Sequence, residues 1–195
     1  MKTIIVLLFL IILFFFIAGV VFDRRKAVSQ KNHNEWLADL PHDHSISSIN
    51  FSQALLIDES AEVILFLQEL DQEEYEYDEI PFYKILEVAL IENNQSVYSF
   101  PKNSVLLNEG KSAVHDEEMD EEDEYIENLT LKVLVDDLTN PVKEFNCIEE
   151  EDYISSETDE YIDAFEECSD WYHKLVILIK RTEKSRTSSK GRIEV

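Results

Sequence analysis

The seven residues from Leu129 to Val135, LTLKVLV, decide the fold class of this chain. Their apolar side chains at 129, 131, 133 and 135 recur every second residue, which is the period of a β-strand with one buried face. A turn signal at 139–141, Thr-Asn-Pro, follows and separates this strand from VKEFNCI at 142–148. The two segments predict an antiparallel pair within a small sheet.

On either side of this pair, the sequence predicts a second hairpin and two helices. SVYSF at 96–100 and SVLL at 104–107 flank the turn residues Pro101 to Asn103, which is typical of a hairpin. In DESAEVILFLQEL at 58–70 the apolar residues recur at helical spacing behind a capping Asp58 or Ser60, and DQEEYEYDE follows as a solvated loop. Pro81 suits the first turn of a helix over FYKILEVALIENN, which Asn93 or Asn94 would close.

The longest predicted helix begins at Ser156 and ends near Ile179. Its apolar residues fall at alternating steps of four and three, which suits either a coiled-coil seam or a core-facing helix: Tyr161, Phe165, Cys168, Tyr172, Leu175 and Ile179. Ala164, Trp171 and Leu178 widen the stripe, and this favours core packing. KLVILIK at 174–180 could alternatively be a buried strand.

The N-terminal segment TIIVLLFLIILFFFIAGVVF, residues 3–22, has no ionisable side chain. As a helix it spans about 30 Å, the thickness of the hydrocarbon core of a bilayer. A cleaved signal peptide and a buried helix are the alternatives, but we expect an uncleaved anchor that contacts membrane lipid. The basic collar of Arg24, Arg25 and Lys26 slightly favours the cytoplasmic or matrix side for the rest of the chain.

The predicted fold is therefore α+β, with a single transmembrane helix followed by a small acidic domain of a few antiparallel strands and about three helices. We divide the chain into an anchor with its collar (1–26), a juxtamembrane linker (27–45), an acidic domain (46–179) and a basic, flexible tail (180–195).

The charge of the chain excludes one class of partner. The 195 residues carry 17 Lys and Arg against 42 Asp and Glu, a formal net charge of −25. Residues 27–179 hold 39 of the acids and only 7 of the bases. Because such a domain repels phosphates, we expect no nucleic-acid partner.

The sequence lacks the patterns of the common enzymes. Gly110 is the only glycine between residues 27 and 179, so phosphate-binding loops and the nucleophile elbow of hydrolases are absent. Metal ligation is conceivable only at two weak constellations of imidazole and carboxylate, which we interpret as exposed acidic surface: His42, Asp43 and His44 with Asp39, and the row Asp163, Glu166, Asp170 and His173. We expect no catalytic site, cofactor or metal.

The two cysteines, Cys147 and Cys168, leave the redox environment open. They could form one disulfide in an oxidising compartment or remain thiols in a reducing one.

The candidate functional residues are carboxylates with tyrosines among them. Aromatic side chains supply contact area, while surrounding charge steers a cationic protein toward the surface. We expect the partner to contact Tyr75, Tyr77, Asp116, Glu117, Glu118, Asp120, Glu121, Glu122, Asp123, Glu124 and Tyr125. The expected function is that of a membrane-anchored protein-interaction domain, an accessory or structural subunit of a membrane complex. The alternative is an inhibitor or immunity-type protein that neutralises a basic toxin or nuclease.

Overall fold

The computed structural model describes residues 28–71, 74–101, 125–149, 152 and 154–190, and divides into two units. The first unit is Met1–Leu40, in which residues 28–39 are helical. The predicted anchor at 3–22 lies outside the described residues. Within the described ranges, no helix has both the length and the hydropathy needed to cross a membrane.

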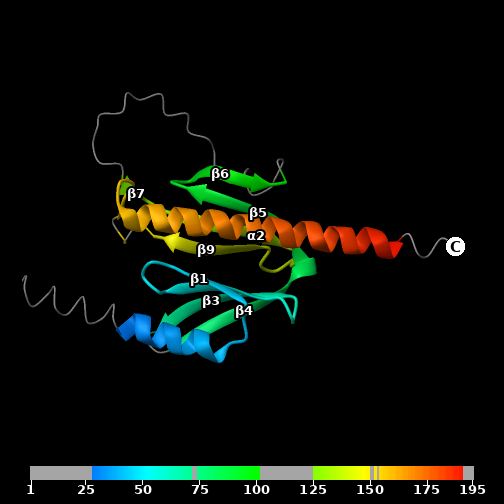
Figure 1. The fold of residues 1–195 in the computed structure, drawn as a ribbon, viewed down its shortest axis with the longest axis horizontal. Helices are drawn as coiled ribbons and strands as arrows, with labels where there is room; N and C mark the ends of the chain where they lie inside the picture. Colours follow the sequence, from blue (N-terminus) through cyan, green and yellow to red (C-terminus); the bar gives the residue numbers. More distant parts are fainter. Residues whose placement is uncertain (1–27, 72–73, 102–124, 150–151, 153, 191–195) are drawn as a thin grey trace, which may run out of the picture. The chain divides into compact units, whose positions relative to one another are not determined.

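The second unit, Pro41–Val195, is an α+β structure that begins with a four-stranded antiparallel sheet. We call it the first sheet. Its strands follow one another in chain order: β1 (His44–Ser47), β2 (Gln53–Asp58), β3 (Val63–Asp71) and β4 (Glu74–Pro81). Neighbouring strands are joined by short connections, so β1 and β4 form the two edges (Figure 1).

The second sheet is also antiparallel and has the order β6-β5-β8-β9. It confirms the predicted antiparallel pair, because Leu129–Val135 is strand β8 and pairs with β9 (Val142–Ile148). On its other side β8 pairs with β5 (Ile85–Glu92), which in turn pairs with β6 (Gln95–Phe100). Two short strands, β7 (Tyr125–Ile126) and β10 (Ile154–Ser155), form a separate pair.

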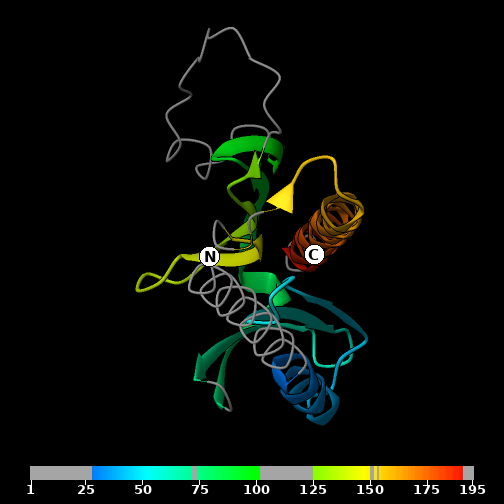
Figure 2. The same cartoon turned by 90° about the vertical axis from the view of Figure 1, so that its left-hand side faces the viewer.

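Helix α2 (Asp159–Lys190) packs against the second sheet, as both views show (Figures 1 and 2). Its buried face includes Cys168, Trp171 and Leu175, and these residues share one hydrophobic cluster with strands of both sheets. The core-facing interpretation is therefore confirmed, and 174–180 is helix rather than strand. The helix continues to Lys190, through residues that the sequence assigned to a basic tail.

The helix predicted over 58–70 is wrong, because Val63–Asp71 is strand β3. Asp58 Oδ1 does accept hydrogen bonds from the N–H groups of Ser60 and Ala61, both at 2.9 Å, as a helix cap would. Glu62 then takes a left-handed φ of 57°, and the chain turns back as a hairpin. Apolar and polar residues do not alternate along β3, because both faces of the strand are buried: Ile64 lies on one face and Leu65 on the other.

The helix predicted after Pro81 is also wrong beyond one short turn. Only η1 (Phe82–Lys84) is helical, and Ile85–Glu92 is strand β5. Asn93 and Asn94 have φ angles of 46° and 61°, and they form the tight turn into β6. Asparagine tolerates this left-handed region, so the predicted helix end is instead a hairpin turn. Among the described residues of the predicted acidic domain, helix α2 and the short turn η1 therefore stand in place of about three expected helices.

Two further predictions concern the segments around these strands. DQEEYEYDE is not a solvated loop in its described part, because Glu74–Pro81 is strand β4. The predicted strand at 96–100 lies within β6, whereas its partner at 104–107 falls outside the described residues.

Candidate functional site

The candidate site is built on β4, which is one of the two edge strands of the first sheet within the described part of the chain. Four of its eight residues are exposed carboxylates, at positions 74, 76, 78 and 79. Backbone groups on the outer side of an edge strand can pair with another extended chain. We call this strand the acidic edge.

The two faces of the acidic edge differ. Its register with β3 places Asp78 opposite Phe66, on the face that joins the shared core, and Glu76 lies two residues away on the same face. Tyr75 and Tyr77 lie on the other face. Tyr75 is 7% exposed but lies outside the hydrophobic cluster that the two sheets share, whereas Tyr77 is 45% exposed.

A groove of about 620 Å³ separates the acidic edge from strand β9. It is lined by residues of β2, β3, β4 and β9 and by the β8–β9 turn. Lys143 reaches from β9 to Asp78, with Nζ 2.5 Å from the carboxylate oxygen, and the lysine side chain is only 12% exposed. This ion pair links the two sheets and uses the one cation among the described residues that line the groove. Of the other two carboxylates that line the groove, Glu144 pairs with Lys132, and Glu76 leaves one negative charge in excess.

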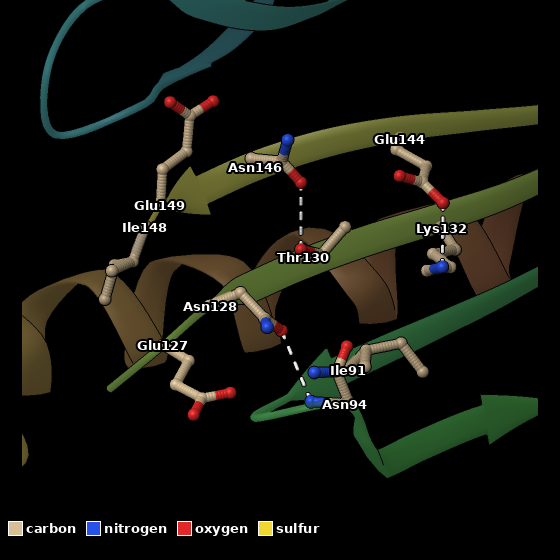
Figure 3. A pocket seen from close by; sticks show the side chains of 10 residues that line it. All are labelled: Ile91, Asn94, Glu127, Asn128, Thr130, Lys132, Glu144, Asn146, Ile148 and Glu149. Atoms are coloured by element: carbon tan, nitrogen blue, oxygen red, sulfur yellow. Dashed lines mark hydrogen bonds and ion pairs between the residues drawn. The ribbon is translucent and has the colours of Figure 1, made fainter. Parts of the chain in front are cut away.

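A second, smaller pocket of about 390 Å³ lies on the outer side of the second sheet (Figure 3). Its polar side chains pair with one another across β8 and β9. Thr130 Oγ1 donates to Asn146 Oδ1 at 2.9 Å, and Lys132 Nζ lies 2.7 Å from Glu144 Oε1. At its rim the N–H of Asn94 donates to Asn128 Oδ1 at 3.4 Å. Because these polar side chains bond to one another, the pocket offers few hydrogen-bonding groups to a ligand.

Comparison with protein-family models, with curated proteins and with solved structures finds no match. The functional conclusion therefore rests on the geometry of the chain itself.

Two carboxylates outside the groove have lowered pKa values, and both shape turns. The side-chain hydrogen bond from Ser60 is the main cause that lowers the pKa of Asp58. Hydrogen bonds from the N–H groups of Thr139 and Asn140 lower the pKa of Asp137 in the β8–β9 turn. Both groups stay ionised and serve the backbone, so neither suits proton transfer.

The residues considered as possible metal ligands make other contacts in the structure. His44 Nε2 lies 3.4 Å from Glu59, and Asp43 accepts the N–H of that same glutamate at 2.7 Å. On α2, His173 Nδ1 lies 2.6 Å from the carbonyl oxygen of Ser169. Among the described residues, no group of three or more His, Cys, Asp or Glu is arranged to hold a metal ion.

The predicted partner-binding residues have unequal positions. Tyr77 and Tyr125, the latter 60% exposed, are available to a partner, whereas Tyr75 is buried. The acidic residues of 116–124 fall outside the described part of the chain. Sequence reasoning missed the carboxylates of β4 as a site because it assigned them to a loop. The sequence did hold a strand signal in the two-residue alternation of this segment, which precedes the buried Ile80. Tyr75, Tyr77 and Glu79 fall on one side of the alternation, and Glu76 and Asp78 fall on the other.

Proposed function

We propose that this chain is a single-pass membrane-anchored protein whose acidic α+β domain binds another protein. In this role it is an accessory or structural subunit of a membrane complex. Residues 3–22 contact lipid, and the positive-inside rule slightly favours the cytoplasmic or matrix side for the domain. The observation that carries the proposal is the acidic edge.

The chemistry of the acidic edge selects the partner. A second copy of the chain would present the same carboxylates, and the repulsion disfavours edge-to-edge pairing of two copies. A basic, extended segment of a partner protein is attracted instead, because its side chains pair with Glu74, Glu76 and Glu79 while its backbone adds to the sheet. Tyr77 supplies apolar contact at the same strand.

Affinity capture with matched charge variants tests the proposal. The edge variant combines Glu74→Gln, Glu76→Gln and Glu79→Gln, and it leaves the Asp78–Lys143 pair intact. The control variant neutralises three exposed acids of α2 through Asp163→Asn, Glu166→Gln and Asp170→Asn. Both remove three negative charges, so they differ only in the surface that is changed.

The full chain is solubilised in detergent, and proteins captured at about 0.1 M NaCl are compared by mass spectrometry. We expect a basic protein that the wild type and the control variant retain equally. The edge variant should bind it about tenfold more weakly, because three exposed ion pairs contribute roughly 0.5 kcal/mol each. Equal capture by all three chains would show that the acidic edge is not the binding surface.

The excess negative charge of the groove also favours a second candidate, the inhibitor or immunity-type protein. Such a protein would bind the cationic site of a toxin or nuclease mainly through charge. Its complex should dissociate at about 0.5 M NaCl, where charge is strongly screened. A subunit held also by anchor packing and backbone hydrogen bonds should remain bound.

A further inference from the structure

Two thiols from distant positions in the sequence meet in the core of the second unit. Cys147 lies on β9 and Cys168 on α2, twenty-one positions further along the chain. Both are buried in the same hydrophobic cluster, and both are free thiols. Cys147 Sγ lies 4.0 Å from the carbonyl oxygen of Ala164, one helical turn before Cys168.

The two thiols are close enough to affect each other's chemistry. A hydrogen bond to the side chain of Cys147 and burial together raise the pKa of the Cys168 thiol well above its ordinary value. Thiolate is the form that attacks a disulfide, so the folded domain resists exchange. An oxidant must therefore react while the chain is folding or locally open.

We propose that Cys147 and Cys168 form an intrachain disulfide when the chain folds in the presence of a small-molecule disulfide oxidant. The bond joins α2 to β9. In the reaction each cysteine loses its thiol proton, one S–S bond forms between the two sulfurs, and the S–S bond of the oxidant breaks to give two thiols. The two electrons released by the cysteines reduce the oxidant, so the exchange is balanced.

A disulfide between Cys147 and Cys168 would affect both the packing of α2 and the stability of the domain. It would fasten the helix that covers the second sheet to the strand that lines the groove. Cross-linking also restricts the unfolded chain, which raises the stability of the folded domain. The bond would persist in an oxidising compartment and would be reduced in the cytosol.

Equilibration in glutathione buffers of one fixed ratio tests the proposal. The full chain is equilibrated in parallel under native conditions and in concentrated urea, then acid-quenched. The disulfide is quantified by mass, from the loss of two hydrogens, and by peptide mapping of the 147–168 linkage. If the folded core suits the bond, its equilibrium constant should be about 100-fold higher in the folded chain than in urea. Oxidation should also raise the urea concentration at the unfolding midpoint, because a disulfide that is more stable in the folded chain stabilises the folded chain.

Cys147→Ala and Cys168→Ala are the controls, because each leaves a single thiol that can form only a mixed or intermolecular disulfide. Neither variant should lose two hydrogens within one chain or gain stability on oxidation. A native-to-urea ratio near or below one would overturn the proposal, and so would a folded chain that carries only glutathione adducts. The wild-type ratio needs no variant, so the test stands even if a single substitution impairs folding.

Discussion

Gln53 shows how single side chains join the two sheets. Its Oε1 accepts the N–H of Asn146 at 2.8 Å, at the side of β9 that faces away from β8. Its Nε2 donates to Glu149 at 3.4 Å, and nearby the N–H of Ile49 donates to the carbonyl oxygen of Cys147. The β1–β2 turn and the first residue of β2 thus provide hydrogen-bond partners for backbone groups of the edge strand β9 that would otherwise be exposed.

We therefore predict that Gln53→Ala lowers the free energy of unfolding by about 1–2 kcal/mol, because it leaves the partly buried N–H of Asn146 without its acceptor. Urea unfolding followed by circular dichroism measures the change. Gln68→Ala is the matched control, since Gln68 also lines the groove but is exposed. Its effect should stay within about 0.5 kcal/mol. Equal losses in both variants would contradict a specific role for the Gln53 bond.

At the scale of elements, whether the sequence identified a strand correctly depended on whether one or both faces of that strand are buried. β8 has one face in the shared core, so its two-residue period is visible in the sequence and its assignment is confirmed. β3 and β5 are buried on both faces over much of their length, and their continuous apolar runs resemble helix. The flanking Asp58 and Pro81 reinforced the error, because both residues serve turns as well as helix starts.

The candidate site was predictable only in part for the same reason. Its acidity and Tyr77 are visible from composition. The edge position of β4 among the described strands depends on long-range pairing, which local spacing does not encode. The meeting of Cys147 and Cys168 has the same origin, since it follows from packing between β9 and α2.

Helix α2 provides a paired test of the packing. Leu175 is fully buried in the core, whereas Ile177, two residues away, is 49% exposed. We predict that Leu175→Ala lowers the free energy of unfolding by about 3 kcal/mol, through lost burial and the cavity left behind. Ile177→Ala should cost less than about 1 kcal/mol. Thermal and urea unfolding of both variants measure the difference, and equal losses would show that α2 packs through another face.

At the scale of the whole molecule, charge is distributed unevenly along the chain and along α2. The exposed side chains in the first half of the helix include Asp159, Glu160 and Asp163, and those in its last part include Lys180 and Arg181. Asp159 and Glu160 lie in the first turn, where they complement the positive end of the helix macrodipole. The chain as a whole keeps a net charge of −25, so the folded domain carries a cost of self-repulsion that the expanded chain relieves.

We therefore predict that salt stabilises this protein. Raising NaCl from about 0.01 M to about 0.5 M shortens the screening length from roughly 30 Å to below 10 Å, and the free energy of unfolding should rise by on the order of 1 kcal/mol. Urea unfolding across a chloride series measures the rise, because chloride perturbs hydrophobic burial less than sulfate does. The edge variant, Glu74→Gln with Glu76→Gln and Glu79→Gln, carries three fewer negative charges on one strand and should show a smaller rise. A stability that falls with salt would mean that the Asp78–Lys143 and Lys132–Glu144 ion pairs outweigh the repulsion among the remaining carboxylates.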